Sequence, residues 1–250
     1  MTIPIIGENN PILKKKVGVV VQCREKSTRL PGKWKADIGG FPMVAHVMDR
    51  CISAVNASAT FFRGGPLFFD VCFAIPEGDS ELKGWLIDHK CKVFEGSPTD
   101  VLKRYYDCAK EHNYAWVARI TADCPLLDYS VAATIINVGV MGNMDYCSNT
   151  IIRTFPDGYD VEMISFRALQ YLNETATSTD REHVTLWLLN PDNMRLFAGK
   201  YRVGQWVNNI DQSDIKISVD TQEELDVVRK EYTKIKEKKD VAKNIGTNVA

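Results

Sequence analysis

The sequence predicts an α/β protein built on a mostly parallel sheet flanked by helices. Short apolar runs alternate along the chain with segments of roughly ten or more residues that have helical patterns, and this alternation is typical of βαβ units. The 250 residues show no internal repeat and no low-complexity linker. A chain of this length can bury a sizeable core as one large domain.

The expected elements follow one another in order. Strands are predicted at residues 17–21, 69–74, 92–94, 116–120, near 146, and at 160–165, 196–201 and 215–219. Helices are predicted at residues 43–54, 80–89, from the turn after 97 to about 112, and at 130–138, 166–175, 181–190 and 223–236. Ser97 or Thr99 is the expected N-cap of the third helix. Residues 55–68 show no clear period and are expected to form a loop that is aromatic at Phe61 and Phe62.

Composition narrows the class of protein. The net charge is −1, so no global basic field favours binding to nucleic acid. The seven cysteines show no C-x-x-C spacing, which favours reduced thiols over a disulfide framework or a zinc site. The N-terminus is too short and too interrupted for a signal peptide, and no long apolar span is present. We therefore expect a soluble cytoplasmic protein.

A basic loop follows the first expected strand. Four cations lie within ten residues, interspersed with small and polar residues: Arg24, Lys26, Ser27, Thr28, Arg29, Gly32 and Lys33. Open α/β sheets bind ligands at the carboxyl ends of their parallel strands. Arginine can hold phosphate oxygens in pairs, and lysine supplies a mobile point charge. The loop therefore predicts a phosphate site, although a solvated charged turn has the same composition.

Two acidic residues are expected at the same edge of the sheet. Asp123 follows the strand at 116–120, and Asp220 follows the strand at 215–219, directly before a capping box that opens the last helix. Such carboxylates are well placed to hold Mg²⁺ beside a triphosphate. We expect their carboxyl groups within ~10 Å of each other. An Asx-turn at Asp123 and a helix-flanking role for Asp220 are the plain alternatives.

Seven segments in order carry a resemblance to a known family. They are S-T-R-L-P-G-K (27–33), D-I-G-G-F-P-M (37–43), E-G-S-P-T-D-V-L-K-R-Y-Y (95–106), R-I-T-A-D-C-P-L-L-D (119–128), S-N-T-I-I-R-T-F-P-D-G-Y-D-V-E (148–162), R-E-H-V-T (181–185) and S-V-D-T-Q-E-E-L (218–225). This set resembles the cytidylyltransferases that make CMP-activated sugar acids, which include the CMP-ketodeoxyoctonate and CMP-sialate synthetases. Among these it looks most like the spore-coat polysaccharide biosynthesis F-type branch. The resemblance spans roughly Val17 to Tyr232.

The resemblance implies a Rossmann-like, GT-A-like nucleotidyltransferase domain at residues 17–236, between an N-terminal extension (1–16) and a tail (237–250). Segment 150–206 is implied to contribute to the acceptor site and to a homodimer interface. The implied activity is transfer of CMP from CTP to a sugar acid or related acceptor, with release of pyrophosphate and with Mg²⁺ as cofactor. The implied setting is surface polysaccharide or glycan biosynthesis, without nucleic-acid or membrane partners.

The resemblance also implies roles for individual residues. Those implied to bind nucleotide are Arg24, Ser27, Arg29, Gly32, Lys33, Ser97, Thr99, Asp100, Arg104 and Asp123. Those implied to face the acceptor are Arg153, Asp157, Asp160, Glu162, Arg181, Glu182 and His183. Asp123 and Asp220 are the implied metal ligands, and Lys33 and Arg24 complete the catalytic set. Arg153 and Arg181 are the expected partners of the acceptor's carboxylate, and a surface ion pair between Arg181 and Glu182 is the alternative.

Catalysis of this kind depends on positioning and charge neutralisation more than on covalent chemistry. The general base stays open among His183, Asp220 and a metal-bound hydroxyl. Three other readings remain: a glycosyltransferase that uses a sugar nucleotide, a nucleotidyltransferase that uses another nucleoside triphosphate, and a non-catalytic nucleotide-binding subunit. Release of pyrophosphate from a free nucleoside triphosphate distinguishes the first and last of these from the expected enzyme.

Overall fold

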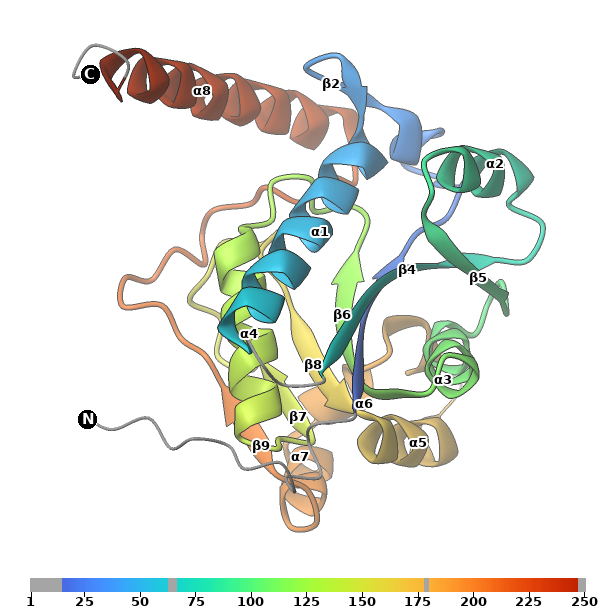
Figure 1. Cartoon of the computed structure of the whole chain (residues 1–250). Helices are drawn as coiled ribbons and strands as arrows, with labels where there is room; N and C mark the ends of the chain where they lie inside the picture. Colours follow the sequence, from blue (N-terminus) through green and yellow to red (C-terminus); the bar gives the residue numbers. More distant parts are fainter. Residues whose placement is uncertain (1–14, 63–66, 178–179, 247–250) are drawn as a thin grey trace.

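A seven-stranded sheet forms the centre of the protein (Figure 1), in a computed structural model that describes residues 15–62, 67–177 and 180–246. The expected extension at residues 1–16 therefore lies almost wholly outside the described residues. The strand order is β5-β4-β1-β6-β8-β7-β9. The strands are β1 (Lys16–Gln22), β4 (Phe68–Pro76), β5 (Lys92–Gly96), β6 (Tyr114–Thr121), β7 (Tyr146–Ser148), β8 (Glu162–Ser165) and β9 (Val203–Gln205). A separate antiparallel hairpin joins β2 (Asp37–Ile38) and β3 (Phe41–Pro42).

The sheet is mostly parallel, as the sequence predicts. Strands β5, β4, β1 and β6 are parallel neighbours. Strand β8 runs antiparallel to both β6 and β7, and β9 pairs with β7 in parallel. The carboxyl ends of the four parallel strands therefore meet at one edge, where ligands bind in sheets of this kind.

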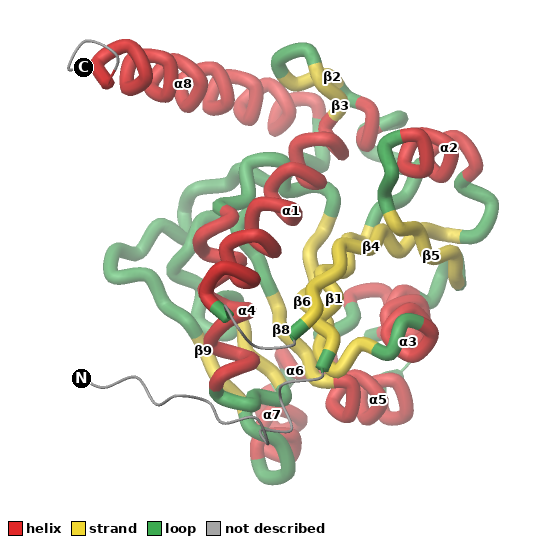
Figure 2. The backbone as a smooth tube through the Cα atoms, in the orientation of Figure 1, coloured by secondary structure: helices red, strands yellow, loops and turns green. Residues whose placement is uncertain are grey.

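Helices cover both faces of the sheet. The described helices are α1 (Met43–Phe61), α2 (Ser80–Asp88), α3 (Val101–Glu111), α4 (Tyr129–Met141), α5 (Phe166–Thr175), α6 (Leu186–Leu189), α7 (Pro191–Ala198) and α8 (Gln222–Gly246). Helices α1 and α4 lie on one face, and α3 and α5 lie on the other (Figures 1 and 2). None of the helices in the described part of the chain is both long and apolar enough to cross a membrane.

The central strand β1 is apolar at successive positions because both of its faces are buried. Successive side chains of a strand point to opposite faces. Val19 and Val21 therefore join the core under α1 and α4, whereas Val20 joins the core under α3 and α5. All three valines are completely buried. A strand covered on both faces reads as an unbroken apolar run instead of an alternating one.

The prediction of a loop at residues 55–68 is wrong for the first half of that segment. Helix α1 continues to Phe61, and residues 63–66 lie outside the described part of the chain. The buried positions Val47, Cys51, Ala54 and Ser58 recur at spacings of three and four, which is the helical period. The small side chains at the later positions hide this period in the sequence.

The expectations for residues 181–201 are also wrong. The predicted helix at 181–190 is a 3₁₀ turn (Arg181–His183) followed by the short helix α6. The first half of the predicted strand at 196–201 lies in helix α7, and the structure has no strand there. The start of α7 is marked by Asn190, whose side chain accepts hydrogen bonds from the backbone N–H groups of Asp192 and Asn193. Pro191 occupies the first turn, where it is well tolerated.

The chain after residue 214 differs from expectation in two ways. Residues 215–219 are extended but are not a strand of the sheet; their link to the body includes a bridge between Lys216 and Asp157. Helix α8 reaches Gly246, so the tail expected at 237–250 is helical for much of its length. Leu225 and Val228 pack against the β2–β3 hairpin region through Ile38. Beyond this contact, α8 runs away from the sheet (Figure 1).

Candidate active site

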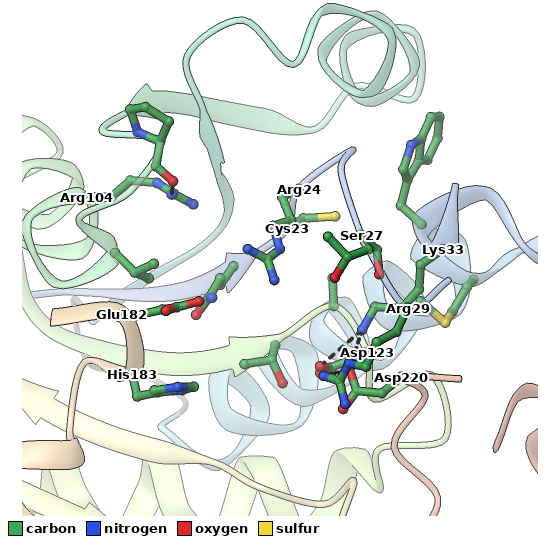
Figure 3. A pocket seen from close by; sticks show the side chains of 18 of the residues that line it. Cys23, Arg24, Ser27, Arg29, Lys33, Arg104, Asp123, Glu182, His183 and Asp220 are labelled. Atoms are coloured by element: carbon green, nitrogen blue, oxygen red, sulfur yellow. Dashed lines mark hydrogen bonds and ion pairs between the residues drawn. The ribbon is translucent and has the colours of Figure 1, made fainter. Parts of the chain in front are cut away.

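A cavity of about 390 Å³ lies at the carboxyl ends of β1 and β6 (Figure 3). Its walls come from the basic loop after β1, the start of α3, the end of β6, the turn after residue 180, and Asp220. The lining residues are Gln22, Cys23, Arg24, Ser27, Thr28, Arg29, Lys33, Trp34, Met43, Pro98, Thr99, Val101, Arg104, Arg119, Thr121, Ala122, Asp123, Glu182, His183 and Asp220. The structure thus brings together residues that are up to 198 positions apart in sequence, from Gln22 to Asp220.

The basic loop is fixed in place by Glu25. Its backbone N–H donates to the carboxylate of Asp79 at 2.7 Å, and its own carboxylate accepts from the backbone N–H of Leu82 at 2.8 Å. Gly32 does not line the cavity; it has φ +70 and turns the chain into the 3₁₀ turn Lys33–Lys35. Glycine adopts this left-handed conformation at little cost. The loop is therefore held so that Lys33 points into the cavity.

Lys33 lies between the two predicted metal ligands (Figure 3). Its ammonium nitrogen is 3.0 Å from a carboxylate oxygen of Asp220 and 3.5 Å from one of Asp123. It also donates to the backbone carbonyl of Val219 at 2.7 Å. Because one nitrogen contacts both acids, their carboxylates lie well inside the ~10 Å separation that the sequence predicts.

Asp220 reaches this edge without a sheet strand of its own. The backbone N–H of Val219 donates to the carbonyl of Asp123 at 2.9 Å, which ties the segment directly to the end of β6. Partial burial by itself would raise the pKa of Asp220, but the hydrogen bond and charge of Lys33, with the charge of Arg29, hold that pKa below its ordinary value. Asp220 is therefore an ionised oxygen donor near neutral pH.

The thiol of Cys23 and the guanidinium groups of Arg24 and Arg29 line the cavity, and they differ in their availability to a ligand. Burial raises the pKa of the Cys23 thiol to about 12, so Cys23 stays protonated and is a poor nucleophile. Arg24 is exposed, and its guanidinium makes no hydrogen bond or ion pair with another described residue. It is therefore available to an anionic ligand. Arg29 is already paired with Asp220 at 3.0 Å.

The start of α3 forms the wall expected near the nucleoside. Thr99 and Arg104 line the cavity, whereas Ser97 and Asp100 do not. Asp100, and not Ser97 or Thr99, is the N-cap: its carboxylate accepts from the backbone N–H of Lys103 at 2.8 Å. The Ser97 hydroxyl accepts from the backbone N–H of Asp100, and its carbonyl accepts two hydrogen bonds from Arg104. Ser97 and Asp100 therefore shape this wall without facing the cavity.

Most of the residues expected to face the acceptor lie outside the cavity lining. Arg153 makes a two-pronged ion pair with Asp160, with both distances 2.7 Å. Asp157 holds the 215–219 segment through its backbone, and its side chain does not line the cavity. Arg181 is bonded to Asp100 at 2.6 Å and to Asn173. The two arginines expected to bind the acceptor's carboxylate are thus already engaged by protein groups.

Glu162 is also buried away from the cavity. One carboxylate oxygen accepts from Arg119 at 2.5 Å, and the other accepts from the Tyr146 hydroxyl at 2.6 Å. Glu182 and His183, in contrast, do line the cavity, on the wall opposite the basic loop (Figure 3). They are followed by Val184, a buried residue with φ +50, a conformation that is strained for a β-branched side chain. This strained turn directs Glu182 and His183 toward the cavity.

Arg119 and Gln22 are cavity residues to which the sequence analysis gave no role. Burial alone would lower the pKa of Arg119, but the carboxylate of Glu162 raises that pKa, so Arg119 is a cation. Its Nε atom and the Oε1 atom of Gln22 are buried and have no hydrogen-bond partner among the described residues. The signal for Arg119 was present, because an arginine interrupts the apolar strand W-V-A-R-I. A buried cation in such a strand needs a partner or a ligand.

The donor set at Asp123 and Asp220 fits a hard divalent cation. The two carboxylates and the carbonyl of Val219 converge on the Lys33 ammonium, and oxygen is the donor that Mg²⁺ prefers. A positive charge is thus already stabilised at this point.

Comparisons with known proteins agree with the fold and the motifs. Residues 18–62 match the model of the family described as Cytidylyltransferase. The chain is 26% identical over 228 residues to the spore coat polysaccharide biosynthesis protein SpsF of Bacillus subtilis, covering 89% of both chains. It is 31% identical over 122 residues to the 3-deoxy-manno-octulosonate cytidylyltransferase of Pseudoalteromonas translucida, covering 48% of this chain and 45% of the relative.

A solved structure extends the likeness to the fold. The cytidylyltransferase of Leptospira borgpetersenii superposes with a TM-score of 0.71 at 25% identity, covering 86% of this chain and 85% of that one. The matched family segment contains the basic loop and Lys33, which line the cavity. In its motifs, its relatives and its fold together, the chain is similar to the cytidylyltransferases, and this similarity indicates a CTP-dependent nucleotidyltransferase.

Proposed function

We propose that this enzyme transfers CMP from CTP to a hydroxyl group of a sugar acid or a related acceptor, with Mg²⁺ and with release of pyrophosphate, in the biosynthesis of a surface polysaccharide. The observation that carries this proposal is the position of Lys33, which joins Asp123 and Asp220 at the mouth of a cationic cavity. The names of the SpsF and 3-deoxy-manno-octulosonate relatives support the pathway and the class of acceptor.

The triphosphate fits the basic side of the cavity. Arg24 is unengaged among the described residues, and Lys33 carries a mobile charge that can leave the two acids for phosphate oxygens. Asp123 and Asp220 would then hold Mg²⁺, which neutralises charge on the phosphates when it is bound. The acceptor oxygen forms the new bond to the α-phosphorus, the bond to the bridging oxygen breaks, and pyrophosphate leaves. Lys33 and Arg24 stabilise the charge that develops on the phosphates.

Gln22 can distinguish cytosine from uracil in the bound nucleotide. Its side-chain amide oxygen, Oε1, is buried in the cavity wall and lacks a hydrogen-bond donor among the described residues. An unsatisfied buried acceptor is costly, so a ligand that donates to it gains affinity. Cytosine carries an exocyclic amine, whereas uracil carries a carbonyl oxygen at the same position. We assign Gln22 to recognition of that amine.

Arg119 takes the role that the sequence analysis gave to Arg153 and Arg181. It reaches the cavity from β6, it is held by Glu162, and its Nε–H has no described partner. A carboxylate of the acceptor would satisfy this donor with a charge-assisted hydrogen bond. His183 lies on the same cavity and can take the proton of the attacking hydroxyl, since Asp220 is held in its ionised form by Lys33 and is a weak base.

The expected homodimer remains part of the proposal. Large apolar side chains that are exposed in the single chain concentrate between residues 150 and 215: Ile152, Leu189, Leu196, Trp206, Val207, Ile210 and Ile215. A second copy of the chain would cover exposed apolar side chains of this kind. Sedimentation of the purified protein at several concentrations tests this point directly.

The central experiment measures pyrophosphate release with each of the four ribonucleoside triphosphates against a panel of sugar acids and their neutral analogues. We expect release that needs CTP, Mg²⁺ and an acidic acceptor together. Activity with a neutral sugar at equal efficiency would overturn the acid as substrate class. A glycosyltransferase would instead consume a preformed sugar nucleotide and release no pyrophosphate.

Two substitutions test the assigned recognition residues. Arg119→Lys keeps a cation beside Glu162 but removes the unpartnered Nε–H, so it should raise KM for the acceptor more than KM for CTP. Arg153→Lys is the matched control, because Arg153 lies outside the cavity. Gln22→Met should reduce the preference for CTP over UTP; unchanged discrimination would remove Gln22 from base recognition.

A further inference from the structure

Three metal-ligating side chains gather outside the active site, on the α3 side of the sheet. Cys72 lies on β4, and Cys108 and His112 lie four residues apart at the carboxyl end of α3. Cys108 and His112 therefore share one face of the helix. One ligand atom from each of the three residues lies within 4.8 Å of the other two. The spacing of 36 residues between the cysteines explains why no sequence motif revealed the cluster.

The geometry of this cluster fits a tetrahedral thiophilic ion. The two sulfur atoms are 3.8 Å apart. Two sulfurs that are each ~2.3 Å from a tetrahedral zinc ion stand about 3.8 Å from each other. The sulfurs thus already have the separation that zinc coordination requires, and no backbone movement is needed to bring them together.

The imidazole supplies the second, independent observation. The Nε2 atom of His112 is buried and has no hydrogen-bond partner among the described residues. Buried polar side-chain atoms in folded proteins nearly always have a partner, so an exception calls for an explanation. A metal ion bound by the two sulfurs could also be bound by a nitrogen of the His112 ring. Phe94 and Tyr114 pack edge-on against this ring at 6.3 Å and 5.5 Å between centroids.

We propose that Cys72, Cys108 and His112 bind Zn²⁺. Two thiolates balance the charge of the ion, and their soft sulfur donors select Zn²⁺ over Mg²⁺. Three protein ligands leave a fourth coordination position, which water would fill. The ion can arrive from solvent, since His112 also lines a second cavity of about 730 Å³.

The carboxylate of Asp70 lies near this cluster but is already paired with lysine side chains, so it does not add a hard oxygen ligand. Asp70 is the nearest candidate carboxylate on β4, but it is engaged by the ammonium groups of Lys16 at 2.7 Å and Lys92 at 2.5 Å. It also accepts from the Tyr114 hydroxyl at 3.3 Å. Asp70 is therefore not free to ligate.

The ion would fasten α3 to β4. Arg104, on the same helix, lines the active-site cavity about two helical turns away from His112. Zinc would therefore be a structural clamp on the helix that builds one wall of the active site. This inference does not depend on which nucleotide or acceptor the enzyme uses.

The test titrates the reduced, chelator-treated full-length protein with Co²⁺ and then with Zn²⁺. We expect a thiolate-to-cobalt charge-transfer band that saturates at one ion per chain and disappears when Zn²⁺ displaces Co²⁺. Bound zinc is counted by elemental analysis after gel filtration. A folded, reduced protein that gives no such band and retains no zinc would overturn the proposal.

Variants locate the ion. Cys108→Ser and His112→Gln should each weaken zinc retention by about tenfold or more. Cys51→Ser, at another buried thiol, is the matched control and should keep the band. Asp220→Asn should also keep it, because the active-site acids offer no thiolate. His112→Gln alters a partly exposed residue just past the end of α3, so it stays informative if Cys108→Ser fails to fold. A full-strength band in both ligand variants would refute the assignment.

Discussion

Replacing Lys33 with methionine tests the centre of the proposed site. The substitution keeps an unbranched apolar stem but removes the ammonium group that contacts Asp123 and Asp220. In the reaction, the same group would stabilise charge on the phosphates. Loss of one such preorganised group typically lowers kcat by about 10²–10³, equivalent to roughly 3–4 kcal/mol of transition-state stabilisation. We expect Lys33→Met to fall in this range.

The effect on folding should be much smaller than the effect on rate. Lys33 donates to two carboxylates and to the Val219 carbonyl, and its side chain is 18% exposed. The acids line an open cavity, so water can replace the ammonium group as their partner. A hydrogen bond to a charged group contributes about 1.5–3 kcal/mol. Because water can replace the ammonium group at these acceptors, we expect the loss of unfolding free energy to be about the size of one such bond and not of all three.

The matched control is Lys35→Met, two residues along the same loop. Lys35 pairs with Glu81 at 2.7 Å on the surface and does not line the cavity. Exposed pairs of this kind contribute about 0–1 kcal/mol, and activity should not change. The assay is steady-state pyrophosphate release with CTP, accompanied by circular dichroism and thermal unfolding. A well-folded Lys33→Met enzyme with near-normal kcat would refute the assignment of Lys33.

Three further predictions follow from the geometry. Asp123→Asn should raise the Mg²⁺ concentration for half-maximal activity by about tenfold or more, and an unchanged Mg²⁺ titration would remove Asp123 from the metal set. The depressed pKa of Asp220 means that its carboxylate stabilises the fold fully above the ordinary carboxyl pKa of about 4, and that this contribution is lost as pH falls through the lower folded-state pKa. The unfolding free energies of wild type and Asp220→Asn, measured against pH, should therefore converge below about pH 4; a constant difference would contradict the ion pair. Gly158→Ala should destabilise the protein by about 1–3 kcal/mol, because Gly158 has φ +120 and an added Cβ would lie 2.9 Å from the backbone of Ile217. Gly78→Ala is the control for the backbone conformational cost alone, because Gly78 has φ +91 and an added Cβ there would meet no neighbouring atom. An equal loss of unfolding free energy in both variants would show that the contact with Ile217 contributes nothing.

The meeting of Lys33 with Asp123 at one edge of the sheet could be predicted because it follows local rules. A buried strand followed by a basic loop, and an acid directly after another buried strand, identify the edge of a parallel sheet where Lys33 and Asp123 meet. Asp220 was placed correctly beside Asp123 although the strand expected before it does not join the sheet. The two acids are linked by long-range contacts, among them the backbone hydrogen bond from Val219 to Asp123, which no local pattern encodes.

The surroundings of the residues expected to face the acceptor were harder to predict, because charge composition does not reveal which charged side chains pair with each other. Arg153 and Arg181 are cations in the expected segment, but their donors are occupied by Asp160, Asp100 and Asn173. Only tertiary structure decides which arginine keeps a free donor. The misplaced elements at residues 181–201 have a related cause, since Asn190 and Pro191 restart a helix inside a segment whose apolar pattern is weak.

The attachment of Asp220 outside the sheet has a consequence for how the enzyme fails on heating. Residues 215–219 are held by backbone hydrogen bonds to Asp157 and Asp123, whereas the sheet is held by long ladders on both sides of β1. Release of this segment alone would carry Asp220, the proposed metal ligand, away while the seven-stranded sheet stays intact. Warming should therefore inactivate the enzyme reversibly at a temperature below that of global unfolding. Amide hydrogen exchange at Ile217 and Val219 should be faster than exchange in β1. Saturating nucleotide with Mg²⁺ should reduce the difference between the inactivation temperature and the unfolding temperature.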